Sequence, residues 1–109
     1  MALFTLTSCS GGYNSEKALQ LCEKVAEDTF TESDVEALLE QYKACLIEIK
    51  PYIEKKKEDG LSDEEQAILS KLLEDYHQIE WRLSDRDVER SCPGTETKFR
   101  KIFREYSWL

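Results

Sequence analysis

Apolar residues recur at helical spacing along two long stretches of the chain. Within each stretch the steps alternate between three and four residues. The first stripe comprises Val35, Leu39, Tyr42, Leu46, Ile49 and Ile53, and the second comprises Leu69, Leu72, Tyr76, Ile79 and Leu83. Such spacing places all members of a stripe on one face of an α-helix. We therefore predict two long amphipathic helices, over about residues 34–57 and 63–90.

A short polar turn separates these two helices. Gly60 suits the left-handed conformation that commonly ends a helix. Ser62 and Glu65 have the spacing of a capping box at the start of the next helix. Two helices joined by so short a connection pack antiparallel. We therefore expect a helical hairpin in which the two stripes face each other.

Shorter helices are predicted at both ends of the hairpin. Asn14 or Ser15 can cap a helix over about residues 16–27. Thr95 or Thr97 can cap another over about residues 96–107. The apolar face of this last helix comprises Phe99, Ile102, Phe103 and Tyr106. The predicted fold is all-α, a long antiparallel hairpin with shorter N- and C-terminal helices in a three- to four-helix bundle. We expect residues 13–109 to form one domain after a flexible leader over residues 1–12.

Two features modify the first long helix. Pro51 lies inside it, where proline removes a backbone donor and crowds the carbonyl of Ile47. We expect a kink between residues 47 and 51, or a break into two helices. Leu38, Cys45 and Tyr52 flank the stripe and widen its apolar face, which predicts contact with more than one neighbouring helix.

Charge narrows the classes of function. Charged residues make up 35% of the 109 residues, and the net charge is -8. This composition suits a soluble helical protein and argues against general affinity for duplex DNA or anionic lipid. Residues 95–109 are the exception, because they carry four basic and two acidic side chains. No run of eighteen apolar residues occurs, so no membrane span is predicted.

Cysteine usage bears on the compartment. Cys9, Cys22, Cys45 and Cys92 include no Cys-x-x-Cys pair, although their even number permits a disulfide framework. Cys22 and Cys45 fall inside helical patterns, where a buried thiol behaves as a small hydrophobe. Residues 6–9 resemble the cleavage box of a bacterial lipoprotein, but residues 1–5 lack the basic start and apolar stretch of a signal peptide. We expect reduced thiols and a cytoplasmic location.

Candidate chemistry is sparse. His77 is the single histidine, and with Glu74 it has the Glu-x-x-His spacing of di-iron helical bundles. Such a site needs a second pair and two further glutamates, so we predict that His77 faces solvent. The glycines form no phosphate-binding loop, and the carboxylates are expected on the polar faces of helices. We expect no catalytic residue, no metal and no cofactor, and therefore not an enzyme.

Trp81 falls outside both stripes. It points away from the apolar face of its helix, and Val88 lies seven residues further along the same side. Large apolar groups are usually buried. Either another helix of this chain covers Trp81 and Val88, or a partner protein does.

The C-terminal helix matches this uncovered line in polarity and charge. Phe99, Ile102, Phe103 and Tyr106 form an apolar face, and the surrounding basic residues oppose the acidity of the rest of the chain. Pro93 and Gly94 permit the chain to reverse. We hypothesise that this tail folds back over Trp81. So short a helix is marginal alone, so a partner that presents a similar helix could displace it.

The order of elements over residues 15–86 resembles that of FliT-type flagellar (type III) export chaperones. Residues 35–40 (VEALLE), 45–51 (CLIEIKP) and 61–65 (LSDEE) carry the resemblance, and the Leu- and Glu-rich residues 69–83 continue it. The resemblance implies a helical chaperone. In that family a C-terminal amphipathic helix can mask the partner-binding surface, and residues 99–106 stand in the corresponding place.

We therefore expect a protein-binding chaperone or adaptor, a monomer or homodimer that captures partner helices on an apolar surface without binding nucleic acid. The candidate contact residues are Trp81, Val88, Phe99, Ile102, Phe103 and Tyr106. The alternative is an acidic inhibitor, encoded by a phage or virus, whose carboxylates imitate phosphates in the channel of a nucleic-acid-binding enzyme. Salt would weaken binding of the inhibitor steeply, whereas apolar mutations would weaken binding of the adaptor.

Overall fold

The computed structural model describes residues 12–107, which form five helices and no strand. The helices are α2 (Ser15–Ala26), α3 (Glu32–Glu58), α4 (Asp63–Leu83), α5 (Arg86–Ser91) and α6 (Thr95–Tyr106). The predicted all-α fold is confirmed. The proposed leader falls almost entirely outside the described residues, as does Cys9. None of the described helices is both long and apolar enough to cross a membrane.

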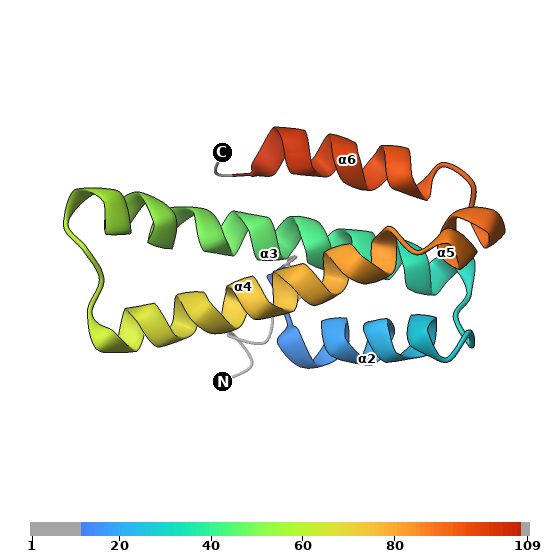
Figure 1. The fold of residues 1–109 in the computed structure, drawn as a ribbon, viewed down its shortest axis with the longest axis horizontal. Helices are drawn as coiled ribbons and strands as arrows, with labels where there is room; N and C mark the ends of the chain where they lie inside the picture. The colour runs from blue at the N-terminus through green and yellow to red at the C-terminus, as the bar shows by residue number, and fades with distance from the viewer. Residues whose placement is uncertain (1–11, 108–109) are drawn as a thin grey trace.

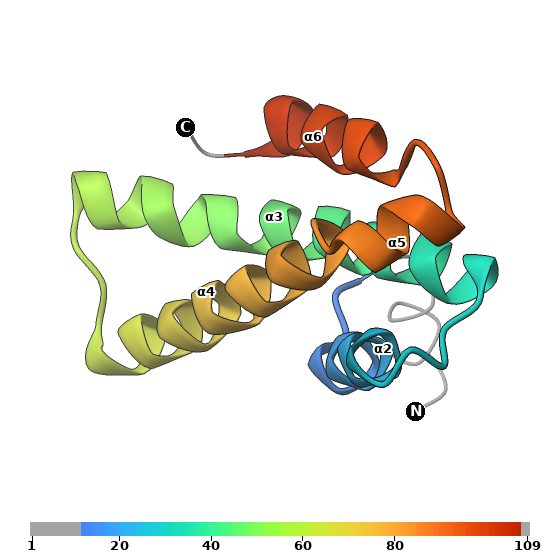
Figure 2. The ribbon, with the colours of Figure 1, turned by 45° about the vertical axis from the view of Figure 1, so that its right-hand side comes forward.

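α3 and α4 form the antiparallel hairpin, with α2 and α6 on different sides of it (Figure 1). α2 packs on α4 and α3, and α6 packs mainly on α3. In the view turned by 45°, α2 and α6 still lie on different sides of the hairpin (Figure 2). Both short helices cover the half of the hairpin that is remote from the 58–63 turn. At the turn itself an ion pair of 2.6 Å between Lys55 and Glu65 links α3 to α4.

Side-chain caps start α2, α3 and α4, and those of α2 and α4 are the ones that the sequence predicts. The Asn14 side chain accepts a hydrogen bond from the Lys17 amide at the start of α2. Thr31 begins α3 and Ser62 begins α4, each with a reciprocal capping box. Gly60 has a φ of 83°, the left-handed conformation expected at the turn.

The core lies where the two stripes meet. All eleven stripe residues are buried except Ile53, which is partly buried against the core. The rings of Tyr42 and Tyr76 stack across the hairpin with their centroids 5.8 Å apart. The buried residues of α2 that complete this core are Ala18, Leu21, Cys22 and Val25. The wide apolar face of α3 therefore serves α4 and α2 together.

Pro51 does not break α3. The helix is continuous from Glu32 to Glu58, as the range 34–57 predicts, so of the two expected outcomes at Pro51 the break into two helices does not occur. Pro51 is exposed, and the Ile47 side chain one turn earlier is 48% exposed. Water can therefore satisfy the carbonyl that proline leaves without a donor, while Ile49 holds the helix against the core.

The second long helix is shorter than predicted. A continuous helix over residues 63–90 is wrong, because α4 ends at Leu83 and α5 begins at Arg86. The Ser84 hydroxyl donates to the Trp81 carbonyl at 3.1 Å, and the Asp85 carboxylate accepts from the Asp87 amide at 2.8 Å. Both side chains thus bond to nearby backbone in place of the helical ladder.

α6 begins differently from the other helices. Its N-cap is Gly94, with a φ of 94° and no side-chain cap of its own, so the expected caps at Thr95 and Thr97 are wrong. The Glu89 carboxylate of α5 instead accepts from the amides of Gly94 and Glu96, at 2.8 and 3.0 Å. These backbone hydrogen bonds lower the pKa of Glu89. The short helix α5 therefore positions α6 through a charged cap.

Candidate functional site

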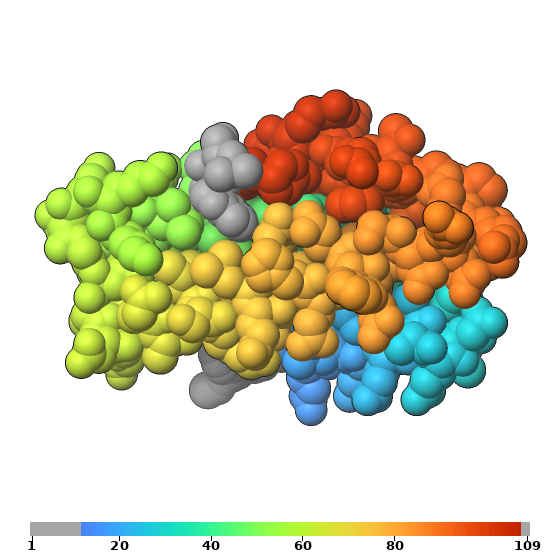
Figure 3. All heavy atoms as spheres, viewed as in Figure 1, coloured from blue at the N-terminus to red at the C-terminus, as the bar shows by residue number. Residues whose placement is uncertain are grey.

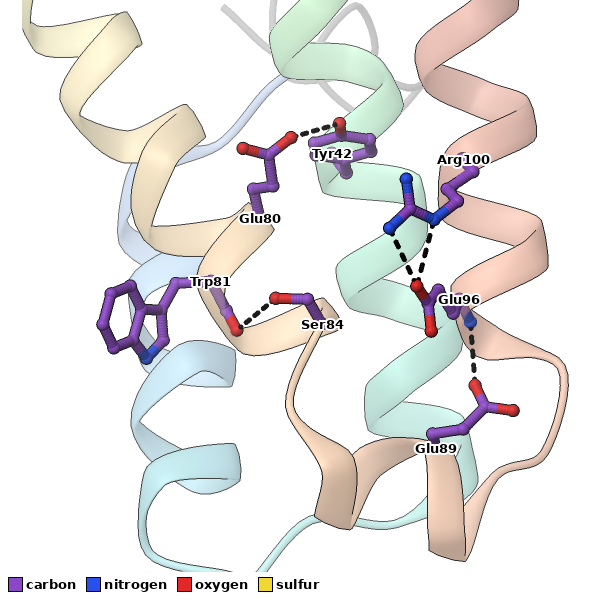
Figure 4. Close-up of polar contacts among 7 residues, drawn as sticks. All are labelled: Tyr42, Glu80, Trp81, Ser84, Glu89, Glu96 and Arg100. Atoms are coloured by element: carbon purple, nitrogen blue, oxygen red, sulfur yellow. Dashed lines mark hydrogen bonds and ion pairs between the residues drawn. The ribbon is translucent and has the colours of Figure 1, made fainter.

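Trp81 is the most exposed large apolar side chain in the described part of the protein. It is 72% exposed, compared with 48% for Ile47 and 42% for Ile68. It lies two residues after the fully buried Ile79, which is about 200° around the helix. His77, Gln78 and Arg82 surround Trp81 along a shallow depression of about 420 Å³. The side chain points away from α6 (Figure 4).

The expected cover over Trp81 is therefore wrong, because α6 packs mainly on α3. Val88 also departs from the predicted shared face, since it is completely buried. The break at residues 84–85 causes this difference. It ends α4 before Val88 and starts α5 on a new axis. Of this pair, only Trp81 remains accessible in the structure.

The apolar face of α6 is divided between the core and the surface. Phe99 is buried, and its ring meets the Tyr42 ring edge-on with centroids 5.6 Å apart. Ile102, Phe103 and Tyr106 are partly buried against the core. The Lys43 ammonium of α3 lies 5.0 Å from the centroid of the Tyr106 ring, a cation–π contact between the two helices. Phe99 thus anchors α6, and its other three apolar side chains lie at the rim.

A groove of about 550 Å³ follows the outer contact between α3 and α6. Its apolar wall includes Leu39, Ile102 and Tyr106, and three acidic and three basic side chains also line it. Because charges of both signs line it, the groove favours no ligand charge.

A smaller pocket, of about 290 Å³, lies between α4 and α6. It is lined by Glu80, Ser84, Phe99, Arg100 and Phe103. In the space-filling view, atoms of α3 are visible between α4 and α6 (Figure 3). Glu80 and Trp81, although adjacent in the chain, point to different sides of α4 (Figure 4).

The carboxylate of Glu80 is oriented by two tyrosines. It accepts from the Tyr42 hydroxyl at 3.4 Å and from the Tyr76 hydroxyl at 3.2 Å. Burial raises the pKa of Tyr76 to about 12, and the charge of Glu80 adds to this shift. Burial and the neighbouring Tyr76 and Glu80 also raise the pKa of Tyr42. Both phenols are therefore protonated donors at neutral pH.

A buried carboxylate at Asp75 contradicts the expectation that carboxylates lie on polar faces. Asp75 is completely buried on α4. It accepts hydrogen bonds from the Tyr13 hydroxyl at 2.9 Å and the Ser15 hydroxyl at 2.6 Å, and it pairs with the Lys71 ammonium at 2.8 Å. The segment before α2 is held further by Gln41 of α3, whose side chain accepts from the Asn14 amide at 2.8 Å.

These partners decide the charge state of Asp75. Burial alone would raise the pKa of its carboxyl, but the hydrogen bonds from Lys71, Ser15 and Tyr13 outweigh that effect and the pKa is lowered. Asp75 is therefore ionised at neutral pH. Its helical spacing from Leu72 and Ile79 places it on the apolar stripe, and this signal was present in the sequence.

The remaining candidate groups are the histidine and the cysteines. No group of three potential metal ligands occurs among the described residues, and His77 is exposed as expected. Cys22, Cys45 and Cys92 are buried and free. Burial raises the pKa of Cys22 to about 11 and that of Cys45 to about 12, so both thiols are protonated and weakly nucleophilic at neutral pH.

Comparison of the chain with protein-family models, with curated proteins and with solved structures finds no match.

Proposed function

We propose that this chain is a protein-binding adaptor or chaperone that captures a helical segment of a partner. The observation that carries the proposal is the 72% exposure of Trp81 at the end of α4. Tryptophan is strongly enriched among the residues that dominate binding energy at protein interfaces. Its ring offers a large apolar area together with one hydrogen-bond donor.

The surroundings of Trp81 support the same proposal. His77, Gln78 and Arg82 provide a polar rim around one apolar anchor, as is common at interfaces. The depression beside Trp81 offers space for an apolar side chain of a partner helix. The resemblance to FliT-type export chaperones favours the same class of function.

Truncation of Trp81 tests the proposal. We expect Trp81→Ala to weaken partner binding by at least about 30-fold, the loss typical of a central tryptophan. Ile47→Ala, which truncates an exposed apolar side chain on α3, is the matched control and should bind like the unaltered protein. The partner is first captured in the native host by a photo-crosslinking residue at position 78, which lines the same depression and leaves Trp81 in place. Its binding segment is then titrated as a purified peptide.

Fluorescence provides a second measurement. A Trp108→Phe background leaves Trp81 as the only tryptophan, and its emission should shift to the blue when the peptide binds. Binding that ignores Trp81→Ala but weakens steeply with salt would contradict the proposal and favour the acidic inhibitor instead.

A further inference from the structure

The pocket between α4 and α6 has the dimensions of a site for a single side chain. Its volume of about 290 Å³ lies at the lower end of the range for ligand pockets. Helices on two sides shape it, and Tyr42 of α3 contacts both Glu80 and Phe99, two of the residues that line it. Its lining includes one oriented carboxylate and two phenylalanines, so the pocket can select a ligand group by both charge and shape.

Glu80 supplies a negative charge that this part of the protein does not balance. Its hydrogen-bond donors, Tyr42 and Tyr76, are both neutral. Within residues 12–107, no lysine, arginine or histidine forms an ion pair with Glu80, although Lys71 forms one with Asp75 on the same helix. A carboxylate that is partly removed from water gains from a cationic donor, since charge-assisted hydrogen bonds are stronger than neutral ones.

The ring of Phe99, which lines the pocket, already lies beside a guanidinium group. Arg100 lies with its guanidinium carbon 5.7 Å from the centroid of the Phe99 ring. Arg100 does not neutralise Glu80, however, because its Nε and Nη2 atoms both donate to Glu96, at 3.0 and 2.9 Å (Figure 4). Glu96 therefore holds the one cationic side chain that lines this pocket, and Arg100 forms no ion pair with Glu80.

We propose that this pocket binds an arginine side chain of the partner protein, with the guanidinium on the Glu80 carboxylate and against Phe99 or Phe103. Arginine fits better than lysine because its planar group stacks on aromatic rings and donates two parallel hydrogen bonds to one carboxylate. This inference rests on the proposed function, and it identifies an anchor on the partner that is separate from the segment at Trp81.

The minimal probe is N-acetyl-arginine amide, and the uncharged isostere N-acetyl-citrulline amide is its control. Both are titrated into the full chain while NMR follows the rings of Phe99 and Phe103 and the amide of Ser84. We expect saturable shifts with the arginine probe and affinity at least about tenfold weaker with citrulline. Equal shifts with the two probes, or no saturable shift with either, would overturn the proposal.

Variants assign the binding to Glu80. Glu80→Gln should weaken the arginine probe at least about tenfold, because it removes the charge and keeps the shape. Glu74→Gln, an exposed glutamate on the same helix, should leave the probe affinity unchanged. If Glu80→Gln disturbs folding by circular dichroism, Phe103→Leu replaces it. This variant keeps the carboxylate, removes a ring, and should weaken the arginine probe but not the citrulline probe.

The two proposals fail in different ways. If a partner depends on Trp81 but tolerates both Glu80→Gln and replacement of each of its arginines, the pocket inference is wrong and the proposed function stands. If the arginine probe binds at Glu80 but no partner depends on Trp81, the proposed function is wrong and the pocket remains.

Discussion

α4 carries two carboxylates, five residues apart, that the protein treats differently. Asp75 and Glu80 both accept hydrogen bonds from tyrosine hydroxyls. Asp75 faces the segment before α2, is completely buried, and has the ammonium of Lys71 as a counter-charge. Glu80 faces α6, is only partly buried, and has two neutral donors. The counter-charge of Asp75 comes from this chain, whereas Glu80 has no cationic partner among the described residues.

This difference separates a structural role from a binding role. A buried ion with a complete set of partners holds elements in register, and loss of one partner is costly. A partly buried ion without a counter-charge can gain a cation from outside. Asp75 therefore fixes the N-terminal segment on the hairpin, and Glu80 is the better candidate for contact with another molecule.

The largest expected effect concerns the apolar contact beside the Asp75 network. Leu72 is buried one turn before Asp75 on α4. Leu72→Ala should lower the free energy of unfolding by about 2–5 kcal/mol, the usual range for emptying a core leucine site. Urea denaturation measures the change, with Ile68→Ala on the same helix as an exposed control. A loss below about 0.5 kcal/mol would show that the stripe is not core.

Asp75→Asn breaks the Asp75 network directly. The Tyr13 and Ser15 hydroxyls both donate to Oδ2, whereas the Lys71 ammonium pairs with Oδ1. An asparagine oxygen can still accept from the two hydroxyls, but its NH2 group then faces Lys71, which loses its acceptor and its counter-charge. We expect a loss of about 1–3 kcal/mol in unfolding free energy. Glu74→Gln, the neighbouring exposed carboxylate, should change stability by less than about 0.5 kcal/mol. Equal effects of the two substitutions would remove the distinction between Asp75 and an ordinary surface carboxylate.

At acid pH, the unaltered protein and Asp75→Asn should have the same free energy of unfolding. The pKa of Asp75 is lower in the folded chain than its ordinary value of 3.8. Asp75 therefore stabilises the fold above that value, and this contribution disappears as the pH falls through the folded pKa. The unfolding free energies of the two proteins, measured by urea titration from pH 7 downward, should converge below about pH 4. A constant gap would show that the charge of Asp75 does not contribute.

Glu80→Gln should have a smaller effect on stability than Asp75→Asn. The amide oxygen can still accept a hydrogen bond from a tyrosine hydroxyl, and no internal cation is left without its partner. We expect a change within about 1 kcal/mol in the same urea assay. A loss as large as that of Asp75→Asn would place Glu80 among the structural residues and weaken the case for an external cation.

Most of the fold could be predicted because local signals and tertiary packing agree. The spacing of Leu69, Leu72 and Ile79 marks the buried face of α4, and Ser62 and Glu65 mark its start. The apolar stripe itself stops at Leu83, because the next positions on that face, residues 86 and 87, are charged. The predicted helix runs past the end of α4 because Val88, seven residues after Trp81, has the spacing that would continue the same helix. Ser84 and Asp85 both favour helix caps, but only the packed structure shows that capping prevails over continuation there.

The candidate site was less predictable for a different physical reason. Exposure of Trp81 depends on where α6 docks, and the anchor of α6 is the contact of Phe99 with Tyr42. Judged from polarity and charge alone, the helix that carries Phe99 could equally have packed on Trp81. The Glu80 pocket combines side chains from α4 and α6, and no spacing within one helix encodes such a combination.

The two hydrogen bonds from residues 13 and 15 to Asp75 also constrain the order of folding. They join positions separated by 62 and 60 residues, whereas the hairpin of α3 and α4 closes through a short turn. Contacts between distant positions form late, because the intervening chain must first be ordered. During synthesis α2 leaves the ribosome before α3 and α4, yet it has no carboxylate to bind until α4 follows. The first of the described helices to be made is therefore expected to be among the last to dock.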